Sequence, residues 1–433
     1  MILSKLSIRN FVCLTLLFVS SGAMAQSLTS SPYSKYGLGE LGGENLPQLR
    51  AMGGISTGIR SLGSYYNINT ENPASYSSIR LMAIDIGVYG NFSTQQRENI
   101  KQSNKNFSLG YLSFAVPVSQ KSALSFGFKP YSSVGYRYSA PGTIDTMNIN
   151  SVYSGEGGLT KAYFGYGQQI GEHFSIGANA GYIFGKIEEN QEAQYPLNSG
   201  ALNSKIENSR AINGFSLDYG IQYFTNINDN YGLVIGYSGN SGHSLRSKAT
   251  RSATRTFGNE TDIEDNIALD TISYKEFARQ DIIMPLEHKV GVSFRKHNSW
   301  LIGGDFHYGK WSDFQEGDVA GNFEDRYGFA IGGSLTPDYT SNRYFSLVDY
   351  RLGFRYDKTQ LRINEQDIND MAITVGLGLP LPSNRQSTFY KINLSAEFGQ
   401  RGTLSSNLVK ENYITLRLGF TLNDRWFQRY KYD

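Results

Sequence analysis

Apolar and polar residues alternate along most of this chain, in about fourteen stretches that run from residue 81 to residue 422. The last stretch is the clearest, since Ile414, Leu416 and Leu418 are each followed by a polar residue or a glycine. Successive side chains of a β-strand point to opposite faces of a sheet, so each stretch predicts a strand with one apolar and one polar face. The predicted strands are about 81–92, 107–118, 122–138, 159–170, 173–188, 210–224, 230–248, 276–296, 299–314, 325–336, 345–357, 365–380, 386–400 and 409–422.

The connections between these strands alternate between short and long. Short turns are a feature of the periplasmic side of outer-membrane barrels and long loops of the outer side, whereas a soluble β-sandwich has no reason for this alternation. A closed barrel also leaves no strand edge unpaired in lipid. We therefore predict an all-β fold, a transmembrane antiparallel β-barrel of about 14 strands over residues 81–422, with both termini in the periplasm. The longer loops are predicted at 93–106, 139–158, 189–209, 249–275, 315–324 and 401–408.

Residues 1–25 have the pattern of a signal peptide. Two basic residues precede an apolar core at 11–19, and residues 23–25 (Ala-Met-Ala) form a cleavage site. A membrane-spanning helix needs roughly 20 apolar residues, so this core is too short to be a retained anchor. Cys13, the single cysteine, lies in this leader, and the mature chain is therefore predicted to lack disulfides and cysteine-ligated metals.

Composition agrees with a barrel and excludes a nucleic-acid partner. The formal net charge is +2, and the leader accounts for this excess with two basic residues and no acidic one. Nucleic-acid binders carry clustered positive charge, which is absent here. The 30 tyrosines and 25 phenylalanines suit the interfacial girdles of a barrel, which places membrane lipid and lipopolysaccharide among the expected partners.

Two segments lie outside the alternating region. Residues 26–80 are rich in glycine, serine and asparagine, and we interpret them as a hatch segment that folds into the lumen; a disordered periplasmic tail is the alternative. Residues 423–433 form a C-terminal tail in which Trp426 and Phe427 stand among charges. This tail suits either an interfacial anchor or a docking peptide for an envelope protein partner.

Residue patterns that would indicate an enzyme, a cofactor or a metal site are weak. The five histidines are scattered and form no His-Glu-x-x-His motif, and no calcium-loop pattern is present. Asp305 and His307 share one strand face, as an acid–base pair would, but we interpret them as polar residues that face the lumen. Acidic residues in the predicted loop 249–275 indicate either a contact surface for a partner or a solvated loop. We therefore expect no enzyme activity, no cofactor and no metal.

Three segments, in this order, resemble the FadL family of outer-membrane transport proteins. Leu49-Arg50-Ala51-Met52-Gly53-Gly54, continuing to Asn72-Pro73-Ala74, resembles the hatch of that family. Residues 300–312 resemble its strand that carries a Trp, an Asp and a terminal Trp-Ser, and residues 349–354 resemble the Arg-x-Gly strand that follows. The order of these segments covers nearly the whole mature chain. The tyrosine-rich start at 32–37 and the charged tail depart from the family pattern.

The resemblance implies a barrel plugged by an N-terminal hatch, for which Gly53, Gly54, Asn72, Pro73 and Ala74 would be the hatch and gate residues. It also implies passive uptake of hydrophobic small molecules such as long-chain fatty acids. In that family the ligand leaves sideways through a wall opening made by a kink in the third strand.

The third predicted strand carries a proline, Pro130, at mid-length. Proline cannot donate a hydrogen bond to the ladder, so the strand must bulge or open there. We take Pro130 as the candidate for a lateral opening; an ordinary bulge without a transport role is the alternative. Pro117 and Pro285 also lie in or near predicted strands, which makes Pro130 less distinctive.

Two functions are compatible with these features in the outer membrane of a Gram-negative bacterium. The first is a passive channel for hydrophobic small molecules, gated by the hatch. The second is a non-transporting barrel subunit of a protein secretion or outer-membrane assembly complex. A channel needs a continuous apolar path through the lumen to the wall opening, whereas a subunit can have a filled lumen and an outer contact surface.

Overall fold

The structure is a computed structural model that describes residues 29–42, 46–63, 65–144, 147–196, 199–257, 267–317, 319–382 and 388–425. The predicted signal peptide and nearly all of the C-terminal tail therefore lie outside the described residues, as do the acidic residues Asp262, Glu264 and Asp265.

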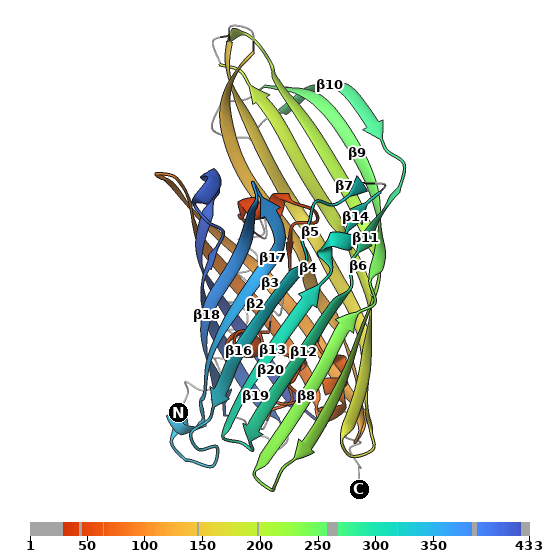
Figure 1. The fold of residues 1–433 in the computed structure, drawn as a ribbon, viewed down its shortest axis with the longest axis vertical. Coiled ribbons are helices and arrows are strands. Elements are labelled where there is room, and N and C mark those ends of the chain that lie inside the picture. Colours follow the sequence, from red (N-terminus) through yellow and green to blue (C-terminus); the bar gives the residue numbers. More distant parts are fainter. Residues whose placement is uncertain are drawn as a thin grey trace, which may run out of the picture.

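Fourteen antiparallel strands form a closed ring, which confirms the predicted barrel (Figure 1). Each strand pairs with the next along the ring, and the last pairs with the first from Met82↔Asp424 to Gln96↔Lys410. The ring is made of β2 (Met82–Arg97), β3 (Ile100–Ser119), β4 (Ser122–Ile144), β5 (Met147–Ile170), β6 (Phe174–Gln194), β7 (Asn203–Asn226), β8 (Tyr231–Asn240), β12 (Glu287–Lys296), β13 (Trp300–Gly309), β16 (Arg326–Leu335), β17 (Asp349–Ile363), β18 (Gln366–Leu381), β19 (Phe389–Arg401) and β20 (Lys410–Asp424).

The alternation of the sequence becomes the two faces of this wall. On β20, Ile414, Leu416 and Leu418 are exposed on the outside, while Thr415 and Thr421 are buried on the inside. An outward apolar band is what contact with lipid requires. We call the end of the barrel where β2 begins and β20 ends the lower end, and the opposite end the upper end; the strand count predicts that the lower end faces the periplasm.

Four of the predicted outer loops are largely strand, which corrects the sequence-based boundaries. β2 and β3 pair as far as Arg97↔Ile100, and β4 and β5 as far as Ile144↔Met147. The upper parts of these strands carry mostly polar residues on both faces, so no apolar face marks them in the sequence, and backbone pairing decides their structure. The strands that replace the other two loops are the upper parts of β6 and β7, most of β9 (His243–Phe257) and β10 (Ile267–Glu276). The predicted strands 230–248 and 276–296 are each interrupted, the first between β8 and β9 and the second between β11 (Gln280–Met284) and β12.

The upper parts of β4 to β7, together with β9 and β10, rise above the rest of the ring on one side (Figure 1). We call this part the projecting sheet. β9 pairs with β7 from Gly214↔Leu245 to Asn203↔Thr256, and β10 pairs with β9. The long strands of one side of the barrel thus continue as a sheet beyond the barrel itself.

The described residues of the N-terminal segment, 29–42, 46–63 and 65–80, lie within the ring of strands (Figure 1). Met52, Ile55 and Ile68 in this segment are fully buried. Gly353 of β17 allows the backbone of the N-terminal segment to lie close to the wall, because a Cβ atom at this position would stand 2.2 Å from the carbonyl carbon of Met52. The short elements of this segment are η1 (Pro32–Lys35), β1 (Glu40–Leu41), α2 (Pro47–Arg50) and η2 (Pro73–Ser78).

The remaining short elements belong to connections between strands. They are η4 (Trp311–Asp313), β14 (Gln315–Glu316), β15 (Val319–Ala320), α3 (Tyr344–Leu347) and η5 (Ser405–Asn407). Within the described part of the chain, no helix has the length and apolar character needed to cross a membrane.

Candidate functional site

The wall has a gap between the upper parts of β3 and β4. These strands pair from Ser119↔Ser122 up to Leu112↔Phe128, and the described pairing stops there although both strands continue. Above that point β3 runs on beside β2, and β4 runs on beside β5. The gap therefore begins two residues before Pro130.

β4 is irregular at the proline that the sequence singled out. The register between β4 and β5 shifts between Pro130 and Ser132, which leaves Tyr131 as the extra residue of a bulge. The predicted bulge is present, and it coincides with the lower limit of the gap.

Part of the N-terminal segment occupies the gap in place of β3. β1 pairs with β4 in the register Glu40↔Ser133 and Leu41↔Ser132, and the backbone N–H of Gly42 donates to Tyr131 O at 2.8 Å. Farther up, the backbone N–H of Gly135 donates to Ser34 Oγ at 3.0 Å. We call residues 34–42 the sealing segment, because they satisfy the edge of β4 where β3 is absent.

Two glycines allow the sealing segment to lie so close to β4. A Cβ atom on Gly39 would stand 2.4 Å from the carbonyl oxygen of Ser133, and Gly39 has a positive φ of 93°. A Cβ atom on Gly42 would stand 2.7 Å from the carbonyl oxygen of Pro130. Any larger residue at either position must push the segment away from the strand.

An apolar cluster fills the upper lumen directly behind the sealing segment. The rings of Trp311, Phe314 and Phe323 pack with centroids 5.1–6.0 Å apart, and Leu38 of the sealing segment belongs to the same cluster. All of these side chains except Phe323 are buried. The other buried members are Val134, Leu159, Ile183, Ile187, Ile212, Leu245, Ile282 and Met284.

The predicted hatch residues lie in the lumen, but at two separate places on the wall. The backbone N–H of Gly53 donates to Thr374 Oγ1 of β18 at 2.8 Å, and a Cβ atom on Gly53 would stand 2.7 Å from Phe354 O of β17. Gly54 follows in the same turn with a φ of 87°. These glycines therefore serve a tight turn against β17 and β18.

The Asn72-Pro73-Ala74 element lies against β6 and β7 instead. The Asn72 side chain accepts from the N–H of Ala74 at 3.2 Å and donates to Thr57 O at 2.8 Å, which caps η2 and ties it to the rest of the segment. Ser175 on β6 donates to Ala74 O at 2.5 Å. Both predicted elements attach the segment to the wall; whether either of them moves as a gate stays a prediction.

Partly buried ion pairs hold the N-terminal segment to β4, β12 and β19 of the wall. Glu71 pairs with Lys129 of β4 at 2.7 Å and with Lys289 of β12. Burial alone would raise the pKa of Glu71, yet the charges of these two lysines hold it well below its usual range. The other two pairs are Arg50 with Glu397 at 2.8 Å and Glu40 with Arg401 at 2.7 Å.

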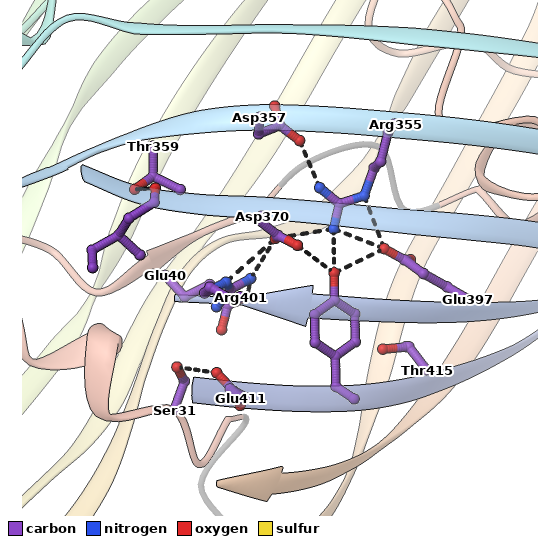
Figure 2. A network of polar contacts seen from close by, with 12 residues as sticks. Ser31, Glu40, Arg355, Asp357, Thr359, Asp370, Glu397, Arg401, Glu411 and Thr415 are labelled. Carbon is purple, nitrogen blue, oxygen red and sulfur yellow. Dashed lines mark hydrogen bonds and ion pairs between the residues drawn. The ribbon is translucent and has the colours of Figure 1, made fainter. Parts of the chain in front are cut away.

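The last two pairs belong to a charged network on β17 to β20 (Figure 2). Arg355 lies at its centre, 2.6 Å from Asp357, 3.0 Å from Asp370 and 2.8 Å from Glu397. The Tyr413 hydroxyl donates to Asp370 at 2.7 Å. Removing one member of such a network leaves an uncompensated buried charge, so the network fixes the segment as well as the wall.

The cavity enclosed here has a mixed polar and apolar lining that includes several charged side chains. It has a volume of about 270 Å³ and is lined on one side by Glu40 and Gly42 of the sealing segment and on the other by Arg355, Asp370 and Arg417. A smaller cavity of about 110 Å³ lies beside Pro130 and reaches Glu71 and Lys161. Charged side chains thus line both of these cavities.

Asp305 and His307 have separate partners. Asp305 accepts the backbone N–H groups of Ser56 and Thr57, each at 2.7 Å, while His307 Nε2 lies 2.8 Å from Asp357. Both therefore support the lumen structure as polar wall residues. Among the described residues no group of three or more His, Cys, Asp or Glu side chains could hold a metal ion.

Several residues of the site could not be predicted from the sequence. Ser34 and Glu40 lie in a segment without periodicity, so nothing in the sequence placed them on β4. The charges at Arg355, Asp357 and Glu397 did carry a signal, since they occupy the polar face of predicted strands and therefore point inward.

Comparison with known proteins gives one family match and many similar structures. A family model described as BamG matches residues 7–433. A search of curated proteins found no match.

The similar solved structures are transporters and channels, which agrees with the expected resemblance to the FadL family. The toluene transporter TbuX of Ralstonia pickettii has a TM-score of 0.58 at 14% identity and covers 90% of this chain and 99% of its own. The toluene transporter TodX of Pseudomonas putida has a TM-score of 0.57 at 16% identity, covering 93% and 100%. A FadL homologue of Pseudomonas aeruginosa has a TM-score of 0.55 at 10% identity, covering 86% and 96%. At these identities the likeness establishes the fold.

Proposed function

The chain belongs to the BamG family, and from its fold and its wall gap we propose an outer-membrane channel for passive uptake of hydrophobic small molecules in a Gram-negative bacterium. In this proposal the N-terminal segment is the hatch, and the cargo leaves sideways through the wall beside Pro130. The observation that carries the proposal is the interruption of the β3–β4 ladder above Phe128.

A gap in a barrel wall needs a reason, because unpaired backbone groups in lipid cost several kcal/mol each. Here the edge of β4 is satisfied by the sealing segment, which can leave without unfolding any wall strand. A purely structural barrel would pair β3 with β4 along their whole length. The apolar cluster behind the seal supplies the kind of surface that a hydrophobic ligand needs. The similar solved structures include toluene transporters and a FadL homologue, which supports hydrocarbon-like or fatty-acid-like cargo.

Locking the sealing segment to the wall tests this function. Leu41 and Ser132 are directly opposed residues of an antiparallel pair, a geometry that suits a disulfide, and the only native cysteine is Cys13 in the predicted leader. We expect the double variant Leu41→Cys, Ser132→Cys to lose uptake of a labelled fatty acid or toluene under oxidising conditions and to regain it with a reductant.

The matched control is Thr94→Cys with Ser103→Cys, an opposed pair on β2 and β3 that the proposal leaves paired throughout. Oxidation of this control should not change uptake. Pro130→Ala should slow uptake without unfolding the barrel, because a strand that can complete its ladder closes the gap more firmly. Uptake that persists in the locked chain contradicts the lateral path.

A second candidate function is a barrel subunit of a protein secretion or outer-membrane assembly complex. The charged lining of the cavity and the ion pairs that hold the N-terminal segment to β4 and β19 favour it, because a subunit can have a filled lumen. The projecting sheet also offers a large surface beyond the barrel for a partner (Figure 1). Family membership adds no cargo that would decide between the two functions.

The locked variant also separates the two candidates. In cells without this protein, a subunit role predicts lower amounts of other outer-membrane or secreted proteins, measured by quantitative mass spectrometry of the envelope. We expect the oxidised Leu41→Cys, Ser132→Cys chain to restore those amounts if the protein is a subunit, because no path has to open. Normal amounts in the deletion strain would rule out the subunit role.

A further inference from the structure

Three arginines meet on the lumen side of the lower end. Arg60 belongs to the N-terminal segment, and Arg295 lies near the lower end of β12. Arg80 lies two residues before β2, and its Nη1 donates to Ser77 O at 2.6 Å. Arg295 Nη1 donates to the hydroxyl of Ser61 at 2.6 Å, which places it beside Arg60. The Ser78 hydroxyl donates to Arg60 O at 2.8 Å, which brings the turn before Arg80 to the same place.

Strand alternation places this cluster inside the barrel. Val292 and Phe294 belong to the outward face of β12, so Arg295 points inward. The guanidinium carbon of Arg60 lies 3.7 Å from the ring centroid of Phe224, and Arg60 Nη2 donates to Gln169 Oε1 at 3.3 Å. The wall therefore separates the cluster from lipid, and the lower mouth of the lumen is its route of access.

No described acidic side chain forms an ion pair with any of these arginines, although most inward-facing charges elsewhere in the lumen have such partners. Arg60 is 8% exposed, and its Nη1 atom is buried without a hydrogen-bond acceptor among the described residues. Arg295 Nε is in the same situation. Glu172 and Asp229, on the nearby turns, form no ion pair with the cluster in the structure.

As it stands the arrangement is electrostatically unfavourable. Burial lowers the pKa of Arg60 to about 9, and the positive charges of Arg80 and Arg295 act in the same direction. A negatively charged group among the three would offset this repulsion and accept the two free N–H groups. Guanidinium groups present their donors in a planar fork that suits an oxyanion.

We propose that Arg60, Arg80 and Arg295 form a binding site for a single oxyanion group, a phosphate or a carboxylate, that enters from the lower mouth of the barrel. Such a group could belong to a free small anion or to an acidic segment of a periplasmic molecule. This site is independent of the lateral gap, and it holds for a channel and for a complex subunit alike.

Thermal unfolding of the full chain in detergent tests the site. Inorganic phosphate should raise the unfolding temperature in a saturable manner compared with sodium chloride at the same ionic strength, because a ligand that binds the folded state stabilises it. A glutamate-rich peptide is the second probe, and a stronger effect of the peptide than of phosphate would identify an acidic segment as the ligand. The absence of a saturable effect for both probes would overturn the proposal.

Three variants locate the effect. Arg295→Gln should weaken phosphate binding by roughly tenfold or more, which corresponds to ~1.4 kcal/mol or more. Arg80→Gln should do the same, and it should not prevent folding, because Arg80 belongs to no wall strand. Arg425→Gln is the control, because Arg425 is an exposed arginine just after β20 at the same end of the barrel. A response of the two site variants equal to that of wild type and control would refute the assignment.

Discussion

Individual charged side chains decide how firmly the N-terminal segment is held. Glu71, Arg50 and Glu40 each meet an opposite charge on the wall, and each wall partner occupies an inward position of its strand. Forming a buried pair gives little net stability. Removing one partner, however, leaves the other charge unpaired in a low-dielectric environment. The contribution of these residues is therefore visible mainly when one of them is lost.

The variant Glu71→Gln should strongly destabilise the fold. It would leave the ammonium groups of Lys129 and Lys289, whose side chains are 18% and 29% exposed, without their carboxylate partner, at a cost of about 1–3 kcal/mol in the free energy of unfolding. Because the pKa of Glu71 is lowered in the folded state, its contribution is present above its ordinary value of 4.5 and is lost as the pH falls through the lower folded value. Wild type should therefore lose more stability than the variant on acidification below pH 4.5, measured by urea unfolding in detergent.

The control for this prediction is Glu276→Gln. Glu276 pairs with Lys248 on the projecting sheet at 2.8 Å, where both side chains are about half exposed. Water screens such a pair, so we expect no measurable change in unfolding free energy or in its pH dependence. Equal effects of the two substitutions would show that burial does not determine the role of Glu71.

At the scale of elements, β4 combines three situations along one strand. Its lower part pairs with β3, its middle part with the sealing segment, and its upper part belongs to the projecting sheet (Figure 1). Pro130 marks the first change, because a residue without an N–H group tolerates the loss of a neighbouring ladder. The structure of this strand depends on which partner lies beside it rather than on its own propensity.

Gly42→Ala should detach the sealing segment from β4. The added methyl group would stand 2.7 Å from the carbonyl oxygen of Pro130, closer than a Cβ atom can approach, so the segment must move. In the Leu41→Cys, Ser132→Cys background we expect this change to reduce the yield of the disulfide severalfold on mild oxidation. Gly142→Ala in β4 is the control, since its Cβ atom would make an ordinary 3.6 Å contact with Ile149. Unchanged disulfide yield in Gly42→Ala would mean that close approach is not what fixes the segment.

At the scale of the whole molecule, the chain forms three parts: the wall of the barrel, the N-terminal segment in the lumen, and the projecting sheet above the barrel. The wall follows from the need to satisfy all backbone groups in lipid, which only a closed ring of strands achieves. The described part of the N-terminal segment places charged and apolar side chains in the lumen, where water would otherwise stand. The projecting sheet satisfies neither need, so its length points to a task outside the membrane.

Sequence by itself determined the wall. Residues such as Ile414 and Leu416 are exposed on the outer face of their strand, and period-two alternation was enough to predict a closed barrel of fourteen strands, though not the full length of each strand. It also located the bulge at Pro130, because the missing N–H group is a property of that residue alone.

Only the tertiary structure decided the contacts that act across long separations in the chain. The sealing segment, the ion pairs of Glu71 and the cluster of Arg60 with Arg80 and Arg295 join residues that lie far apart in sequence. The projecting sheet escaped prediction because polar residues occupy both faces of its strands along most of their length, so no apolar stripe marks them in the sequence. The local pattern of a sequence indicates which face of a strand is buried. Which residues then contact each other depends on the closure of the ring, because closure places residues that are distant in sequence side by side.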